Sequence, residues 1–334
     1  MDLNGINTQN NAAAIRATIY SGVLRTQLEP ELMAMKYVDV ISNFPDGDKW
    51  QDVEIGNASV HDFVEGSDVT FDGLAIGTRD FEINRYLYSG HFITEKFSQD
   101  AYLAAQIAAK IPAIEARAIM AKLEKDIFAL EADCQTANDT NTVDGYRHRF
   151  VAGYVDGAND QPGTITPADI SYGVSALDAI LYTGPKVMIV PSFQQHLIGT
   201  FGDLAKLSFN PKWEGIVREG AVSGIHFAFS IYGVDVYVSN FLPKVSSETI
   251  EMSMSASGST KTVADGAVAV LFANIPERRP FRMAWRMMPK FEGRWVMEKR
   301  REEYLTVGRY GVGAGDTKNL ICMVCKSTPD TTVS

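Results

Sequence analysis

Apolar residues recur at a helical spacing through residues 95–133, the longest periodic stretch of the chain. Steps of mostly three or four residues place them on one face of a helix; they are Leu103, Ile107, Ile111, Ile114, Ala118, Leu123, Ile127 and Leu130. The spacing predicts one long helix, with a kink or a break at Pro112, which cannot donate a hydrogen bond to the carbonyl of Ala108. A continuous helix of this length would be about 58 Å long, which suits a structural spine.

Residues 50–88 have the alternation of a two-stranded ribbon. Val53 and Ile55 alternate with polar residues, as do Phe81 and Ile83, and glycines lie between the two runs. Two strands alone are marginally stable in water, and their open edges invite pairing with another chain. We therefore predict that this ribbon is an interaction arm.

Helix and strand patterns alternate through the rest of the chain. The polar residues 135–165 predict a loop and a domain boundary, and Thr166 followed by Pro167 predicts the capped start of a helix. The other predicted elements are a helix over 12–24, a strand over 186–190, a helix that opens at 191–192, a hairpin over 227–238, a buried strand over 267–272 and several strands over 281–326 that return beside the long helix.

Charge is unevenly distributed along the chain. The 334 residues carry 41 acidic and 31 basic side chains, a net charge of −10. Residues 278–309 hold ten Lys or Arg and four Glu, so this segment contributes +6 and the remainder −16. The overall sign disfavours broad nucleic-acid binding. The basic segment fits contact with acidic neighbours, contact with packaged nucleic acid, or a solvated strand face.

The composition is that of a globular protein, with 46% hydrophobic and 22% charged residues. The longest strongly apolar run, residues 267–273, is far shorter than the roughly 20 residues that cross a bilayer. The first residues lack the basic and apolar regions of a signal peptide. We expect no membrane partner and an intracellular site of synthesis.

The three cysteines, Cys134, Cys322 and Cys325, are too few for a disulfide framework. The Cys-x-x-Cys spacing is half of a zinc or redox site, which needs further ligands. Because Cys322 and Cys325 are three residues apart in an apolar run typical of a buried strand, we predict that they point to opposite faces as small buried residues.

Other chemical motifs fail on their spacing. The five histidines form no metal-binding pattern and are expected at the surface or at interfaces; they are His61, His91, His148, His196 and His226. The glycines of residues 311–315 lack phosphate-loop spacing and are expected in a flexible connection between strands. Ser192 lacks a nucleophile elbow. We predict no catalytic residue, no metal site and no cofactor.

The remaining candidates are charged residues that could join two copies of the chain. Arginine is suited to bidentate contact with carboxylates. We predict that Arg278 and Arg279 form an ion pair between subunits with an acid of the ribbon, and the candidate partners are Asp62, Glu65 and Asp68.

A resemblance to a known family appears at residues 233–243, Gly-Val-Asp-Val-Tyr-Val-Ser-Asn-Phe-Leu-Pro. This segment resembles the Gly-x-x-Val-Tyr-x-Ser-Asn-x-Leu-Pro pattern of tailed-phage major capsid proteins with the HK97 fold. The run Ile-Val-Pro-Ser at residues 189–192 and the order of the elements are also similar to that family. The implied fold is α+β, with an N-terminal arm (1–47), an extended β E-loop (48–92), a P-domain spine helix (93–135), an A-domain (145–272) and returning P-domain strands (273–334).

The resemblance implies a major capsid protein, not an enzyme, that self-assembles into the icosahedral shell enclosing phage DNA. The implied partners are other copies in pentamers and hexamers, a separate scaffolding protein, a portal, a cement protein and nonspecifically bound double-stranded DNA. The implied location is the virion, after assembly in the host cytoplasm. Some family members crosslink through an E-loop lysine, but residues 50–94 contain no lysine, so we expect noncovalent assembly.

Two other functions stay open from the sequence. An encapsulin-like compartment shares the implied fold and encloses protein cargo. A metal-dependent or redox enzyme that uses Cys322 and Cys325 belongs to a different class of protein.

Overall fold

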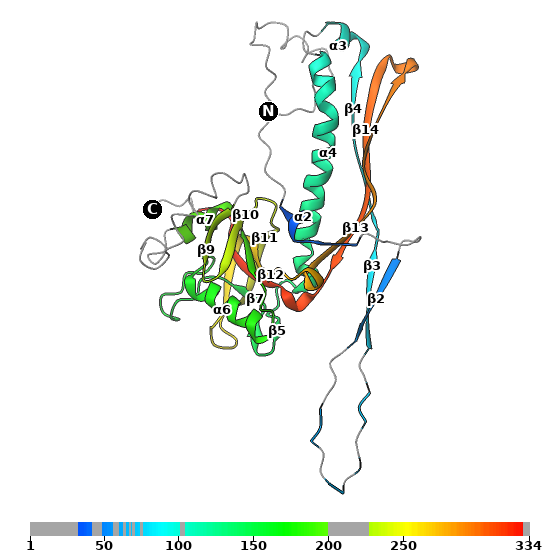
Figure 1. The fold of residues 1–334 in the computed structure, drawn as a ribbon. Coiled ribbons are helices and arrows are strands. Elements are labelled where there is room, and N and C mark those ends of the chain that lie inside the picture. The colour runs from blue at the N-terminus through cyan, green and yellow to red at the C-terminus, as the bar shows by residue number, and fades with distance from the viewer. Residues whose placement is uncertain are drawn as a thin grey trace.

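The computed structural model describes residues 33–41, 49–55, 60–62, 65–66, 68, 71–73, 76–100, 104–199 and 227–329. These residues form an α+β fold with two main sheets, a long helix and a projecting ribbon (Figure 1). The helix predicted over 12–24 lies outside the described residues, as does His226.

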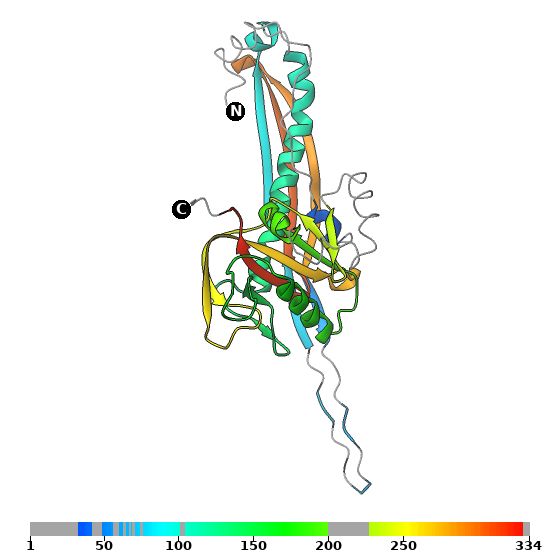
Figure 2. The same cartoon turned by 90° about the vertical axis from the view of Figure 1, so that its left-hand side faces the viewer.

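A four-stranded sheet and the long helix α4 (Ala104–Ala129) form the elongated half of the molecule (Figure 2). The strand order is β1 (Asp39–Val40), β13 (Phe281–Val296), β14 (Arg301–Ala314) and β4 (Arg85–Thr94). β13, β14 and β4 are antiparallel, and β1 is parallel to β13. β13 and β14 therefore return beside the long helix, as predicted.

A seven-stranded mixed sheet forms the compact half. Its order is β7 (Arg149–Val151), β15 (Ile321–Lys326), β12 (Thr260–Ala273), β8 (Lys186–Val190), β10 (Val234–Val238) and β9 (Phe227–Ile231), with β11 (Lys244–Glu251) beside β12. The predicted strand over 186–190, the hairpin β9–β10 and the buried strand in β12 are all confirmed. β15 joins this sheet between β7 and β12, whereas β13 and β14 lie along the helix.

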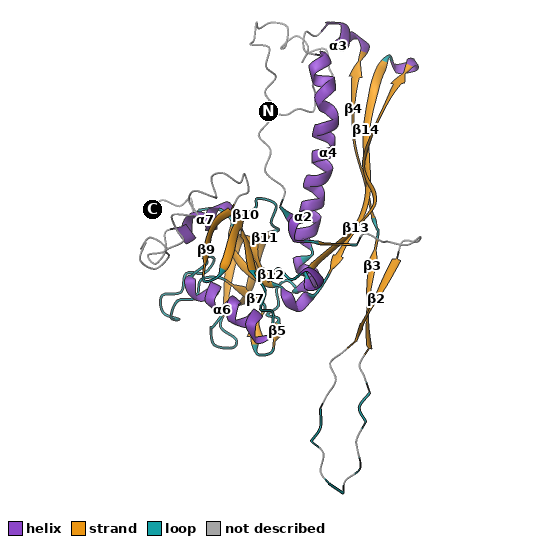
Figure 3. Cartoon of the chain, in the orientation of Figure 1, coloured by secondary structure: helices purple, strands orange, loops and turns teal. Residues whose placement is uncertain are grey.

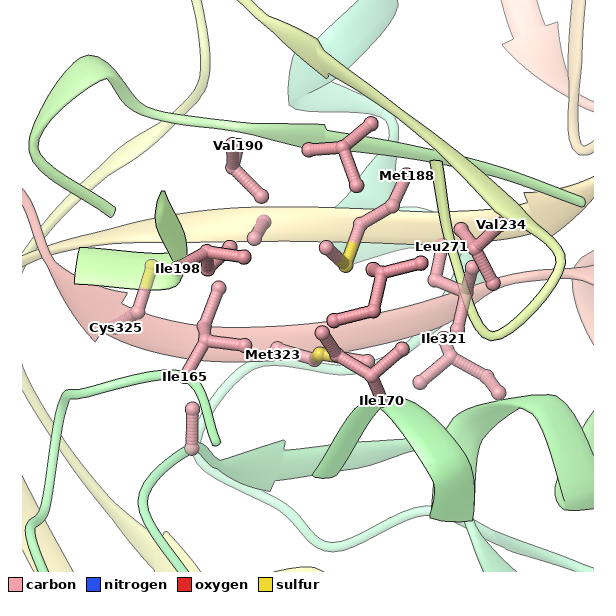
Figure 4. Packing of buried hydrophobic residues seen from close by; sticks show 14 of the residues in the cluster. Ile165, Ile170, Met188, Val190, Ile198, Val234, Leu271, Ile321, Met323 and Cys325 are labelled. Carbon is pink, nitrogen blue, oxygen red and sulfur yellow. The ribbon is translucent and has the colours of Figure 1, made fainter. Parts of the chain in front are cut away.

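The central strands of the seven-stranded sheet are buried on both faces, as residues 266–273 of β12 show. Side chains of a strand alternate between faces. Ala269, Leu271 and Ala273 point to one face and join a core beneath α6 (Pro167–Ala179) and α7 (Ser192–Gly199), shown in Figure 4. The residues between them, such as Phe272, point to the other face and join a second core with Leu123 and Ile127 of α4. The sheet is thus the middle layer between these helices and the end of α4.

The start of α6 confirms the predicted cap. The Thr166 side chain accepts a hydrogen bond from the amide of Asp169, and the Asp169 side chain accepts one from the amide of Thr166. Pro167 occupies the first turn, where a missing N–H has no consequence. This capping box begins α6 at the predicted residue, and α7 likewise opens at Ser192.

The helical stretch over residues 95–133 differs from its prediction in two ways. α4 ends at Ala129 and a separate short helix, α5 (Glu131–Cys134), follows it, while α3 (Glu95–Asp100) precedes it in the chain. α4 continues through Pro112, so the helix is not broken there. Ile114 is 41% exposed, whereas Glu115 is fully buried. The predicted apolar stripe is therefore wrong at this turn, because a hydrogen-bonded carboxylate occupies the buried position.

The ribbon consists of β2 (Lys49–Ile55) and β3 (Ile76–Glu82), which pair antiparallel from Lys49 opposite Glu82 to Ile55 opposite Ile76. It projects away from both sheets (Figures 1 and 2). The remaining short elements, drawn by type in Figure 3, are α2 (Ala34–Tyr37), β5 (Thr142–Val143), β6 (Tyr146–Arg147), η2 (Pro276–Arg278), η3 (Met297–Lys299) and η4 (Thr317–Asn319). β5, β6 and β7 interrupt the loop predicted over 135–165.

Candidate assembly surfaces

The two strands of the ribbon and the described residues between them expose apolar side chains that no other described residue covers. Val60 is 93% exposed and Phe71 is 91% exposed, and Val53 and Ile76 on the two strands are also exposed. Lys49 and Glu82 form an ion pair at the root of the ribbon. A two-stranded element without a hydrophobic face of its own gains little from folding alone. The exposed side chains and open edges suit contact with another chain.

The root of the ribbon crosses the end of β14 at close range, and this explains the glycines there. A Cβ atom on Gly311 would lie 2.4 Å from the carbonyl oxygen of Glu82, and one on Gly313 would lie 2.8 Å from the ring of Phe81. Phe81 and Ile83 are buried in a small cluster at this crossing. The predicted flexible connection is wrong: residues 311–314 are β-strand, and the glycines permit close packing.

The four-stranded sheet has one covered and one exposed face. Ile93 of β4 packs with residues of α3 and α4. Tyr86, Tyr88 and Phe92 alternate with that covered set and are exposed. The guanidinium carbon of Arg301 lies 4.4 Å from the ring centroid of Phe92. This aromatic face is a second surface on which another chain could pack.

The basic segment over residues 278–309 forms many of its ion pairs inside the chain. At least five of its ten bases have acidic partners; the pairs are Arg282–Asp39, Lys290–Glu292, Arg294–Glu303, Arg300–Glu95 and Arg301–Glu303. The basic side chains of three pairs, Lys290, Arg294 and Arg300, are exposed to solvent. Glu292 and Glu303 are already counted in the +6 of this segment, so only Asp39 and Glu95 lower its positive excess. The pairs give the strands a surface of mixed charge that keeps a positive excess.

The two predicted contact arginines have different environments. The Arg279 guanidinium is half-buried and donates from Nη1 to the carbonyl of Val38 at 2.7 Å. Arg278 is exposed, and its guanidinium carbon lies 5.8 Å from the ring centroid of Tyr182. Arg279 therefore holds the N-terminal segment within its own chain, while Arg278 presents its charge to the surface.

The acids predicted as partners of these arginines are exposed on the ribbon side of the molecule; they are Asp62, Glu65 and Asp68. Nothing in one chain tests whether they meet an arginine of another copy. The pairing stays a prediction.

A buried ion network joins the end of the long helix to the seven-stranded sheet. Arg149 is fully buried; its Nε and Nη2 donate to the two carboxylate oxygens of Glu248 at 2.6 and 2.8 Å. Its Nη1 donates to Glu131 of α5 and, at 3.2 Å, to the carbonyl of Gln135. Burial raises the pKa of Glu131, and the charge of Arg149 opposes that shift. The network fixes the two halves relative to each other.

Two further buried acids of α4 hold the four-stranded sheet. Glu115 accepts hydrogen bonds from Thr306 Oγ1 and from His91 Nδ1, both at 2.7 Å. Asp126 accepts one from the Tyr310 hydroxyl at 2.9 Å. Buried carboxylates of this kind need such partners, and here the partners come from β4 and β14. The sheet and helix are therefore joined by specific polar contacts as well as by apolar packing.

The cysteines behave as predicted. Cys322 and Cys325 are fully buried and belong to the cores on opposite faces of the seven-stranded sheet. Burial raises the pKa of the Cys325 thiol to about 12 and that of Cys322 well above its usual range. They present no shared face to a metal or a substrate.

The histidines follow the prediction with one exception. His61, His91 and His196 lie at the surface. His148 is fully buried, with Nδ1 placed 3.2 Å from the carbonyl of Leu320, and burial lowers its pKa. The described residues contain no group of three or more His, Cys, Asp or Glu placed to hold a metal ion. None of the described helices is both long and apolar enough to span a bilayer.

No family model matches the chain, and no curated protein matches its sequence. Solved structures do match it. A structure from Mycobacterium phage Che8 has a TM-score of 0.62 at 13% identity and covers 92% of this chain and 96% of its own. The mature capsid of bacteriophage PhiM1 has a TM-score of 0.64 at 11% identity, with 94% and 93% covered. The capsid of Ralstonia phage GP4 has a TM-score of 0.61 at 10% identity, with 95% and 96% covered.

The chain has the fold of phage capsid subunits. At these identities the likeness concerns the fold, and it extends over more than nine-tenths of the chain. Within this capsid fold, sequence reasoning located the ribbon and the long helix but missed the aromatic face of β4. The alternation of Tyr86 and Tyr88 with Leu87 was the available signal. It also missed Arg149, which lies in a stretch that we interpreted as loop.

Proposed function

We propose that this chain is the major capsid protein of a tailed phage and that its copies tile an icosahedral shell around double-stranded DNA. One observation carries the proposal. The chain has a phage capsid fold over almost its full length, and that fold includes a ribbon with exposed apolar side chains and no core of its own. A single chain leaves this ribbon unsupported, whereas a shell of many copies supports it.

The proposal includes the HK97-type division of the chain. Residues 1–47 form the N-terminal arm, 48–92 the E-loop, 93–135 the spine helix, 145–272 the A-domain and 273–334 the returning P-domain strands. β15 modifies this division, because it lies within the sheet of the A-domain. The role is structural and needs no cofactor.

The proposed partners follow from the shell. Copies of the chain form pentamers and hexamers, and simultaneous weak contacts multiply the stability of each subunit in the lattice. A separate scaffolding protein, a portal and a cement protein complete the particle, which is assembled in the host cytoplasm and becomes the virion. DNA is enclosed without sequence-specific contacts.

The first test is negative-stain electron microscopy of the full chain, expressed alone and together with the products of its neighbouring genes. Closed shells, tubes or hexameric sheets are the expected result. A monodisperse monomer in every sample would contradict the proposal.

A second test concerns the predicted ion pair between subunits. Arg278→Glu should weaken assembly with little effect on the unfolding of the isolated chain, because Arg278 is exposed. Arg279→Glu is the matched comparison: it removes the hydrogen bond to Val38 and should lower the thermal midpoint of the chain itself.

Rescue by charge exchange would identify the acid that meets Arg278. Arg278→Glu combined with Asp62→Arg, Glu65→Arg or Asp68→Arg should restore particles for one of the three acids. If Arg278→Glu assembles normally, or if no exchange restores a defect, the predicted pair is wrong, while the shell itself is judged by the microscopy.

A further inference from the structure

Glu124 of α4 lies where three parts of the chain meet. The residue is only 2% exposed. Its Oε2 accepts a hydrogen bond from the backbone amide of Met33 at 2.8 Å, and its Oε1 accepts one from the Ser239 hydroxyl at 3.4 Å. The amide of Ala34 is a further donor. One carboxyl group therefore joins the N-terminal segment, the long helix and the loop after β10.

The segment that docks here is also held by apolar packing and by two further polar contacts. Ala34, Tyr37 and Val38 are buried in the core that contains α4 and one face of the seven-stranded sheet. The ring of Tyr37 lies edge-on to that of Phe272, with centroids 5.7 Å apart. Arg279 donates to the carbonyl of Val38, and a side-chain hydrogen bond joins Tyr37 to Tyr237. Docking of residues 33–38 thus combines apolar burial with the hydrogen bonds to Glu124.

None of the described residues gives Glu124 a cationic partner. The ammonium group of Lys36 lies 5.8 Å from the ring centroids of Tyr37 and Tyr237, and that of Lys125 lies 5.7 Å from the ring centroid of Phe241. The charged and titratable side chains on the surrounding elements are Lys36, Tyr37, Lys122, Lys125, Asp126, Asp235, Tyr237, Arg279 and Tyr310. Within the described part of the chain, an ionised Glu124 would therefore be a buried charge held by neutral donors alone.

We propose that Glu124 is a proton-linked latch, which holds residues 33–38 most tightly when its carboxyl is protonated and releases them more readily as the pH rises past neutrality. A protonated carboxyl keeps a carbonyl oxygen that accepts from the Met33 amide, and it can donate its proton to Ser239 Oγ. The hydrogen bonds survive protonation, while the penalty for burying a charge is removed.

The direction of this pH dependence follows from the linkage between proton binding and docking. Burial raises the pKa of Glu124 to about 7, against the hydrogen bonds from Met33, Ala34 and Ser239, which lower it. Release of the segment admits water to the carboxyl, so its pKa falls toward the ordinary value of 4.5. The docked form binds the proton more tightly than the released form, and docking weakens as the pH rises between these two values. Above about pH 8 Glu124 is ionised in both forms, and docking weakens no further.

The test is hydrogen–deuterium exchange of the full chain, read by mass spectrometry on the peptide that covers residues 33–41. Labelling times are scaled to the intrinsic exchange rates at about pH 5.5 and about pH 8. With the two pKa values above, protection of this peptide should be at most roughly 30-fold greater at the lower pH. Glu124→Gln, which stays neutral, should retain high protection at both.

The matched control is Glu115→Gln, because Glu115 is a buried acid of the same helix that contacts β4 and β14 instead of the N-terminal segment. This variant should keep the pH dependence of residues 33–41. Ser239→Ala gives an independent measurement if Glu124→Gln does not fold. It removes a hydrogen bond that lowers the pKa, so the midpoint of the protection profile should move to higher pH.

Three results would overturn the latch: equal protection of the wild-type peptide at both pH values, greater protection at the higher pH, or a pH dependence that persists in Glu124→Gln. The latch lies within a single chain and does not depend on assembly. The latch can therefore be disproved while the proposed shell stands, and the shell can be disproved while the latch stands.

Discussion

The ribbon and the seven-stranded sheet are both built from paired strands, yet they are stabilised in opposite ways. In β12, residues 266–273 are all buried, and the side chains of residues 268–273 alternate between two cores. In the ribbon, Val53 and Ile76 are exposed on the strands, and Phe71 is almost fully exposed beyond them. The sheet obtains its stability from its own chain. The ribbon lacks that support and is suited to obtain it from a neighbour.

This contrast separates two kinds of mutational effect. A change in the sheet should lower the free energy of unfolding of the isolated chain, and assembly should suffer only as a consequence. A change in the ribbon should leave the free energy of unfolding of the isolated chain unchanged and act on assembly directly. The following substitutions test the two halves of that statement.

The largest effect is expected at Arg149, the cation between the sheet and the long helix. Arg149→Met should lower the free energy of unfolding by about 5 kcal/mol, because Glu131 and Glu248 would stay buried without a cation. Chemical denaturation of the isolated chain measures this loss. Arg294→Met is the control, since it removes an exposed ion pair with Glu303 and should change little.

The pH dependence of that loss checks its cause. Burial already raises the pKa of Glu131, and removal of Arg149 should raise it further. Protonation then relieves the buried charge, so the deficit of Arg149→Met should be smaller at about pH 5 than at about pH 8. A deficit that is equal at both pH values would point to lost packing instead of an unpaired carboxylate.

A smaller loss is expected from Phe272→Ala in β12. Phe272 is fully buried, and its ring packs edge-on against Tyr37 and Phe281. Truncation leaves a cavity in the second core and should destabilise the isolated chain by about 4 kcal/mol. Phe272→Leu, which fills much of that space, should recover most of the loss. Unchanged stability in Phe272→Ala would contradict the claim that the sheet is internally supported.

The contrast also shows which features sequence patterns could predict. Strands β8, β10 and β12 were predictable because unbroken or alternating apolar runs reflect burial on one or two faces. The α6 start was predictable because the capping box is a local pattern around Thr166 and Pro167. The ribbon was predictable from alternation interrupted by glycines, although its contacts between chains were not.

The missed features depend on contacts between residues distant in sequence. Arg149 lies in a polar stretch, and its burial is made favourable mainly by two carboxylates, those of Glu131 and of Glu248, which is 99 positions away. Glu115 replaces an expected apolar residue because Thr306, 191 positions away, supplies a donor. Gly311 resembles a flexible connection until the root of the ribbon is seen to cross it. Periodicity carries no information about such partners.

A modest effect is expected from Thr166→Ala, which removes half of the capping box on α6, a helix that covers the sheet. The loss should be about 1 kcal/mol, measured as a small fall in the denaturation midpoint. Ser175→Ala in the same helix is the control, because its exposed hydroxyl donates to the carbonyl of Ser171 and caps nothing. Equal effects of the two substitutions would show that the capping box does not stabilise α6.

The smallest effect on unfolding, and the sharpest test of the comparison, is expected from Phe71→Ala. The side chain is 91% exposed, so its removal should leave the denaturation midpoint of the isolated chain within error. In a shell the same ring would be buried against a neighbour, and its loss should reduce the yield of particles in sedimentation and electron microscopy. Phe71→Leu should restore much of that yield, because it returns apolar area without the ring.

If Phe71→Ala assembles like the wild type, this ring makes no important contact, and the support of the ribbon must come from its backbone edges or from its other exposed side chains. If it lowers the midpoint of the isolated chain instead, the ribbon is packed within its own subunit and the contrast with the sheet fails.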